Sequence, residues 1–111
     1  MNTSLNEPTE RLAMARPISA ATARRRHGAG AVLVDIRPQV ARHQGSTTGA
    51  LLIDPSSVAD HIIDRHREIV LCGVSARRAI SAAEQLSHLG YDRVHYLAGG
   101  YAAWHHRATT R

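Results

Sequence analysis

The sequence predicts a three-layer α/β domain, with a central, mainly parallel sheet of about five strands and helices on both faces. Three observations predict this fold. Apolar runs at residues 31–34 and 69–71 show no polar alternation, which is typical of strands buried on both faces of a parallel sheet. Such runs alternate along the chain with helical patterns. The length of 111 residues suits one domain with a single core.

The first half of the chain contains three expected strands and two expected helices. Residues 1–14 are polar and predict a disordered tail before a domain at residues 15–107, with a second tail at residues 108–111. A short strand near residues 15–18 leads to Ser19, a residue suited to cap a helix. That helix is expected to run to about residue 27, before Gly28 and Gly30. The next elements are expected to be a strand at 31–34, a short helix at 38–43, a loop at 45–49 and a strand at 50–53.

A further helix is expected to open at residues 54–57, where Asp54 and Ser56 are suited to capping. Its apolar face is predicted to carry Val58, Ile62 and Ile63. Residues 68–72 follow as the central strand of the sheet, because their apolar run is unbroken.

The last part of the chain carries the clearest helix, at residues 76–89. Small and apolar side chains recur there at helical spacing, and the repeat consists of Ala79, Ala83 and Leu86. Gly90 is expected to end the helix. A strand at 94–97 and a glycine turn at 99–100 follow. A closing helix at 101–107 is expected to pack Tyr101 and Trp104 against the sheet.

Composition narrows the classes of function. All 14 basic residues are arginine, and the formal net charge is +5. The one dense basic patch, residues 24–27, has no interleaved aromatic residues, so a solvated helix end is favoured over nucleic-acid binding. No run approaches the roughly 20 apolar residues that span a bilayer. One cysteine cannot form an intrachain disulfide, so a cytoplasmic location is expected. The histidines, including His61 and His66, show no metal-ligand spacing, so neither a metal nor a cofactor is predicted.

Cys72, the only cysteine, lies where the central strand ends and a helix is about to begin. Ligands of parallel sheets bind at this edge. If the following loop curls around the sulfur, its backbone amides, the helix dipole and nearby arginines lower the pKa of the thiol. The same groups suit an anionic substrate, and the candidate binding residues are Gly73, Val74, Ser75, Ala76, Arg77 and Arg78. The alternative is an inert thiol in the core.

Four segments in the correct order resemble the rhodanese-like family of single-domain sulfurtransferases. Residues 33–37 resemble its strand ending in Asp-x-Arg, and residues 45–50 its Gly-His-Ile-Pro-Gly-Ala segment, with Ser46 and Thr48 in place of His and Pro. Residues 69–72 resemble the strand that carries the catalytic cysteine, and residues 97–104 the closing Gly-Gly-x-x-x-Trp motif.

The resemblance implies that Cys72 carries sulfur as a persulfide, moving it from a small anionic donor such as thiosulfate to a thiol, cyanide or a sulfur-acceptor protein. The family loop commonly reads Cys-x-x-Gly-x-Arg-Ser, whereas this chain has Ser75 and Arg78 at the glycine and serine positions. A serine in a glycine turn is expected to add backbone strain or to reshape the loop.

Two alternatives remain open at this point. The spacing from Cys72 to Arg77 matches sulfur-transferring rhodaneses, whereas the spacing to Arg78 is that of cysteine phosphatases and arsenate reductases. The altered loop also fits a binding or sulfur-carrier module without rapid turnover.

Asp35 and Arg37 are interpreted as residues that organise the pocket through hydrogen bonds to the backbone.

Overall fold

The computed structural model describes residues 15–38 and 49–109. Its centre is a five-stranded sheet in the order β1-β5-β4-β2-β3, and every pair of neighbouring strands is parallel. The strands are β1 (Arg16–Ile18), β2 (Val32–Asp35), β3 (Leu51–Leu52), β4 (Ile69–Cys72) and β5 (Val94–Leu97). The predicted fold class is therefore confirmed, with a sheet that is parallel throughout the described residues.

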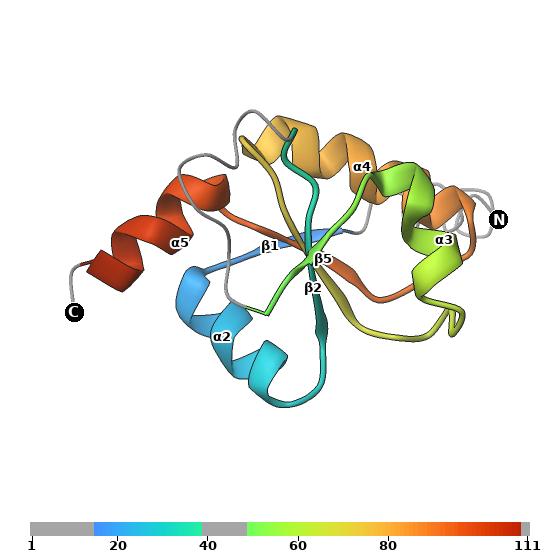
Figure 1. Ribbon diagram of the computed structural model, residues 1–111, viewed down its shortest axis with the longest axis horizontal. Helices are drawn as coiled ribbons and strands as arrows, with labels where there is room; N and C mark the ends of the chain where they lie inside the picture. Colours follow the sequence, from blue (N-terminus) through green and yellow to red (C-terminus); the bar gives the residue numbers. More distant parts are fainter. Residues whose placement is uncertain (1–14, 39–48, 110–111) are drawn as a thin grey trace, which may run out of the picture.

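The helices cover both faces of this sheet (Figure 1). In chain order they are α2 (Ala20–Gly28), α3 (Val58–His61), α4 (Ala76–His88) and α5 (Gly100–Thr109). A 3₁₀ turn, η2 (Pro55–Ser57), precedes α3. The expected helix at 38–43 falls largely on residues that the structure does not describe.

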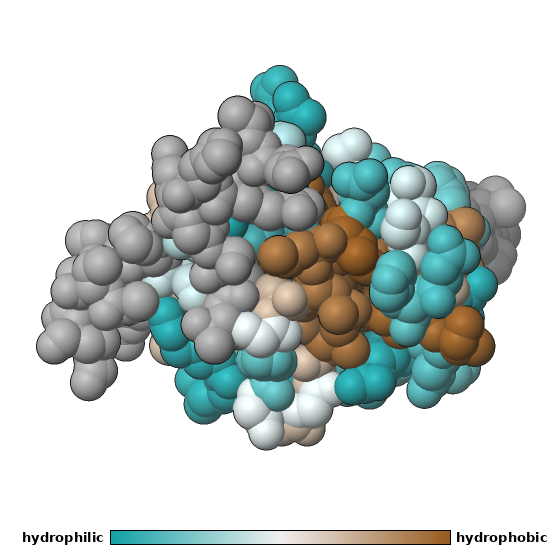
Figure 2. Space-filling model, viewed as in Figure 1, coloured by the Kyte–Doolittle hydropathy of each residue, from teal (hydrophilic) through white to brown (hydrophobic). Residues whose placement is uncertain are grey.

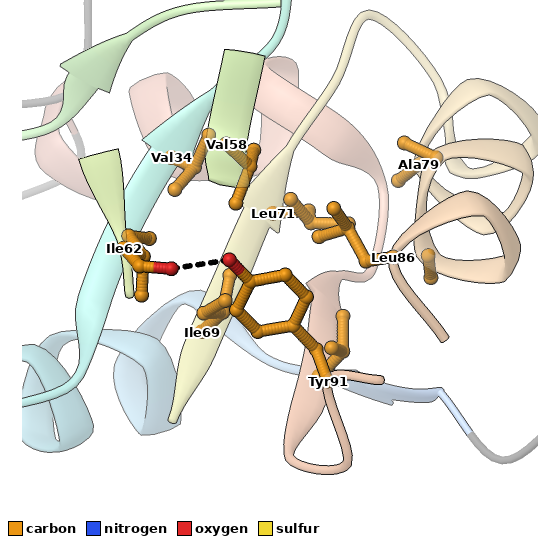
Figure 3. Packing of buried hydrophobic residues seen from close by; sticks show 11 residues of the cluster. Val34, Val58, Ile62, Ile69, Leu71, Ala79, Leu86 and Tyr91 are labelled. Carbon is orange, nitrogen blue, oxygen red and sulfur yellow. Dashed lines mark hydrogen bonds between the residues drawn. The ribbon is translucent and has the colours of Figure 1, made fainter. Parts of the chain in front are cut away.

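One core lies between the sheet and the helices α3 and α4 (Figure 3). Val34, Ile69 and Leu71 of the sheet pack there against Ala79 and Leu86 of α4 and against other apolar residues. The hydroxyl of Tyr91 donates a hydrogen bond to the carbonyl of Ile62, which closes this core at the end of α3 (Figure 3). The helical spacing predicted for residues 76–89 thus places the small side chains of α4 directly on the sheet.

A second core lies on the other face of the sheet, under α2 and α5. Alternate residues of the buried strands point there, because side chains along a strand alternate between faces. The cluster combines small residues of α2 with the aromatic residues of α5: Ala20, Ala23, Ala31, Leu33, Val70, Cys72, Leu97, Tyr101 and Trp104. Cys72 therefore belongs to this second core, and Leu71 belongs to the first.

The structure corrects two expectations about residues 54–63. Helix α3 ends at His61, so Ile62 is buried but Ile63 points away from the core and is 76 % exposed. Asp54 precedes the 3₁₀ turn without a side-chain capping bond, and Ser56 lies inside that turn. Four helical residues are too few to align Val58, Ile62 and Ile63 on one face.

The outer strand β3 pairs with β2 through only two residues, and both of them are partly exposed. Leu51 and Leu52 are among the exposed large hydrophobic residues, and Figure 2 shows an apolar area at the centre of this face of the molecule. Within the described residues, no helix combines the length and apolarity needed to cross a bilayer.

Candidate active site

Cys72 ends the central strand β4 and has no exposed surface. Its strand neighbour across the sheet is Asp35, and the amide of Ile36 donates a hydrogen bond to the Cys72 carbonyl at 3.0 Å. The side chain belongs to the same buried cluster as Leu97 and Tyr101. The carboxyl ends of β2, β4 and β5 thus meet around this thiol, at the sheet edge where ligands of parallel α/β domains bind.

The surroundings of the sulfur favour the neutral thiol. Burial and, to a lesser extent, the carboxylate of Asp35 raise the pKa of Cys72 from 9.0 to about 12, while the guanidinium of Arg37 acts in the opposite direction. The lowered pKa predicted from the sequence is therefore wrong for this conformation. Among the residues described, no hydrogen bond reaches the Cys72 sulfur, so the expected ring of loop amides around it is not formed.

Beside the sulfur lies a buried ion pair between Asp35 and Arg37, which are 0 % and 2 % exposed. The Arg37 Nε and Nη2 groups donate to the two carboxylate oxygens at 3.0 and 2.9 Å. The Arg37 amide also donates to Asp35 Oδ1 at 3.1 Å. Such a bidentate pair fixes both side chains. The predicted hydrogen bond from a pocket-organising side chain to nearby backbone is present here.

The loop between Cys72 and α4 is short, because α4 already begins at Ala76. Ser75 is the N-cap: its φ of −143° and ψ of 165° are extended, and its hydroxyl accepts a hydrogen bond from the Arg78 amide at 3.4 Å. No described residue other than glycine has a positive φ. The expected strain of serine at the family's glycine position is therefore absent, since Ser75 caps a helix instead of entering a left-handed turn.

The predicted binding residues divide into a buried part and an exposed part. Gly73, which follows Cys72, is buried and Ala76 is half-buried, whereas four residues around the start of α4 are exposed: Val74, Ser75, Arg77 and Arg78. Within the described chain, neither the Arg77 nor the Arg78 side chain has a hydrogen bond or ion pair. The charged groups that shift the pKa of Cys72 are instead Asp35 and Arg37.

The start of α5 contacts the cysteine loop, a role that the sequence analysis did not predict. The Tyr101 amide donates a hydrogen bond to the Gly73 carbonyl at 2.9 Å, and the Tyr101 ring covers the Arg37 guanidinium, whose carbon lies 3.7 Å from the ring centroid. Gly100 has a φ of +65°, and a Cβ there would lie 2.7 Å from the Gly73 carbonyl oxygen. In the sequence, the signal for this close contact was the pair of glycines that precedes Tyr101.

The basic patch at residues 24–27 is less solvated than expected. Arg24 stacks on Trp104, with 4.2 Å between its guanidinium carbon and the ring centroid, and it donates to the Trp104 carbonyl at 3.1 Å. Arg26 forms an ion pair with Glu68. These contacts fasten α2 to α5 and to the start of β4. Of the histidines considered for a metal site, His61 contacts the Ser57 carbonyl and His66 contacts Asp92.

The family model of the rhodanese-like domain matches residues 19–107. The chain belongs to this family. A thiosulfate sulfurtransferase GlpE of Pseudomonas fluorescens is 35 % identical over 77 residues, covering 68 % of this chain and 71 % of that protein. A GlpE of Pseudomonas putida is 39 % identical over 83 residues, covering 72 % and 73 %. The solution structure of an Anabaena rhodanese-like domain is 22 % identical with a TM-score of 0.72, covering 85 % of this chain and 76 % of that one.

Proposed function

We propose that this rhodanese-like domain is a thiosulfate sulfurtransferase that carries sulfane sulfur on Cys72. The observation that carries the proposal is the position of the chain's only thiol, at the carboxyl end of the central strand and beside a buried ion pair. Family membership and the names of the GlpE relatives support sulfur transfer as the chemistry. No described feature favours the alternative, a cysteine phosphatase or arsenate reductase that uses Cys72 with Arg78, over sulfur transfer.

The proposed reaction has two covalent steps. The Cys72 thiolate attacks the outer sulfur of thiosulfate, and the bond between the two donor sulfurs breaks, so that sulfite leaves with the electron pair. Cys72 then holds a persulfide. In the second step cyanide or a thiolate attacks the outer sulfur of the persulfide, and the Cys72 thiolate leaves. The negative charge is conserved in each step, and the enzyme returns to its starting form.

The raised pKa means that the Cys72 proton must leave before the attack. With its pKa raised to about 12, Cys72 is almost entirely a neutral thiol near neutral pH in the described conformation. Arg37 stabilises that thiolate, whereas Asp35 opposes it. We propose that the anionic donor binds at the start of α4, where Arg77 and Arg78 are exposed and where a helix leaves its first amides without intrahelical partners.

The second candidate is a sulfur-carrier or docking module, and the raised thiol pKa is the observation that favours it. In that case Cys72 holds sulfur without rapid turnover, or does not react at all. The two candidates differ in rate and in the need for an acceptor, so a single set of measurements separates them.

The test uses the intact chain, mixed with thiosulfate and examined by mass spectrometry, followed by a steady-state assay of thiocyanate formation from cyanide. Gain of one sulfur atom with turnover supports the enzyme. Gain without turnover supports the carrier, and no gain with any sulfane donor supports the docking module. A Cys72→Ser variant serves as the control, and persistence of sulfur transfer in this variant would overturn the assignment of Cys72.

A further inference from the structure

Three arginine side chains stack on aromatic rings in the described part of the chain. They are Arg24 on Trp104, Arg37 on Tyr101 and Arg65 on Tyr91, with 4.2, 3.7 and 4.7 Å from guanidinium carbon to ring centroid. The Arg37–Tyr101 stack is the shortest, and both residues are buried. A cation stacked on a ring is held more strongly when water is excluded. This stack is also the one beside Cys72.

Tyr101 contacts the surroundings of Cys72 from two directions. Its ring covers Arg37, which donates side-chain hydrogen bonds to both carboxylate oxygens of Asp35, and Asp35 is the strand neighbour of Cys72. Its amide binds the carbonyl of Gly73, the residue that follows Cys72. The ring also shares the buried cluster of the thiol. Tyr101 therefore connects the end of β2, the end of β4 and the start of α5.

We propose that Tyr101 is a positioning residue for Cys72: its ring fixes Arg37 beside the sulfur and its position holds the loop that follows. The face of the ring carries this role, because the stack on Arg37 and the packing in the cluster both use the ring. The expected effect of Tyr101 on catalysis rests on the proposed sulfurtransferase function. Its expected effect on access to the Cys72 thiol does not, because that access is measurable without turnover.

Removal of the ring has two expected consequences. The buried sulfur loses part of its cover, so small reagents reach it faster. Arg37 keeps its bonds to Asp35 but loses the ring that limits its movement, so this cation, which favours the thiolate, is held less firmly. Alkylation of the thiol is therefore expected to accelerate while sulfur transfer slows. A variant that is labelled faster but transfers sulfur more slowly has lost the positioning of the thiol. A variant in which both rates fall has lost the reactivity of the thiol.

The experiment compares wild type with Tyr101→Leu, Tyr101→Phe and Tyr91→Leu. Tyr91 is the matched control, because it is a buried tyrosine stacked on Arg65 in the other core. The readouts are the rate of iodoacetamide labelling, the kcat and KM for thiosulfate, and the melting temperature. Since Cys72 is the only cysteine, total label reports this thiol alone.

For Tyr101→Leu we expect labelling about tenfold faster and kcat about tenfold lower, with KM changed less than kcat. Tyr101→Phe recovers most of both effects, because it retains the ring. Tyr91→Leu lowers the melting temperature but changes labelling and kcat per folded molecule by less than about twofold.

Three results would overturn the proposal. The first is a Tyr101→Leu variant that is labelled at the wild-type rate. The second is a Tyr101→Phe variant whose labelling rate and kcat match those of Tyr101→Leu. The third is a Tyr91→Leu variant whose labelling rate and kcat change as much as those of Tyr101→Leu. If the wild-type chain turns over no sulfane donor, the sulfurtransferase function fails, and the labelling rates still decide whether Tyr101 positions Cys72.

Discussion

The thiol of Cys72 lies beside a paired carboxylate and guanidinium, and burial outweighs both in setting its pKa. The sequence placed the cysteine beside arginines that follow it in the chain, Arg77 and Arg78. The fold brings Arg37 to it instead, together with Asp35. The protonation state of the thiol is therefore coupled to the stability of the folded state.

The first prediction concerns stability at alkaline pH. Because folding raises the pKa of Cys72 from 9.0 to about 12, the unfolded chain loses this proton first. The contribution of the thiol to stability is present below the unfolded pKa and is lost as pH rises toward the folded pKa, by up to about 1.4 kcal/mol per pH unit. Urea denaturation across this range should show wild type losing stability relative to Cys72→Ala. A constant difference between the two proteins would contradict the raised pKa.

The second prediction concerns the buried ion pair. Asp35→Asn removes the buried carboxylate that pairs with Arg37, so we expect a loss of about 3–5 kcal/mol in the free energy of unfolding. Asp92→Asn is the control, because Asp92 pairs with His66 on the surface, and we expect a change of at most about 1 kcal/mol. Chemical denaturation measures both variants. Equal losses of stability in the two variants would mean that burial does not increase the contribution of the Asp35–Arg37 pair to the free energy of unfolding.

At the scale of elements, α4 and α5 both begin beside Cys72, one through Ser75 and the other through Gly100. Ser75 uses its hydroxyl as a cap, so a serine suffices where the family commonly has glycine. Gly100 has no such substitute, because its φ is positive and the Gly73 and Val74 carbonyls occupy the space that a Cβ would take. The two positions therefore tolerate substitution very differently.

The third prediction tests this close approach. In Gly100→Ala the new Cβ would lie 2.7 Å from the Gly73 carbonyl oxygen and 2.9 Å from that of Val74, so α5 or the cysteine loop must move. We expect sulfurtransferase kcat to fall about tenfold or more, with a loss of about 1–3 kcal/mol in stability. Gly28→Ala is the control, since a Cβ there meets nothing within 4 Å. Comparable kcat values in the two variants would contradict the role of Gly100.

Sequence patterns predicted the long elements well, and contacts between elements poorly. Unbroken apolar runs located β2 and β4, and helical spacing located α4, because these signals are local. Ile63 was misplaced because a four-residue helix is too short for its face to be judged from spacing. The stack of Tyr101 on Arg37 joins residues 64 positions apart, and no local signal encodes such a pair.

At the scale of the whole molecule, the sheet separates two cores with different tasks. The core under α3 and α4 contains neither Cys72 nor its ion pair, whereas the core under α2 and α5 contains the thiol. The strand-end position of Cys72 was predictable from the sequence. The state of its thiol was not, because that state depends on α5 closing over it from the far end of the chain.

The fourth prediction follows from this separation. Leu86→Ala removes a fully buried side chain from the core under α3 and α4, and we expect a loss of about 2–5 kcal/mol in stability. The kcat per folded molecule should change by less than about twofold, because the cavity lies on the opposite face from Cys72. Denaturation and activity measured on the same preparation check this. A parallel fall in kcat would show that the two cores act as one.

A sulfur with no exposed surface cannot meet the sulfur of another molecule, because a disulfide needs the two atoms about 2 Å apart. In this conformation the chain is therefore shielded from oxidative cross-linking, although its single cysteine would otherwise have only intermolecular partners. Oxidation by a peroxide and attack on thiosulfate both require access and thiolate character, so both need the side chains around the sulfur to move. The packing that keeps Cys72 protonated thus also limits when the sulfur reacts.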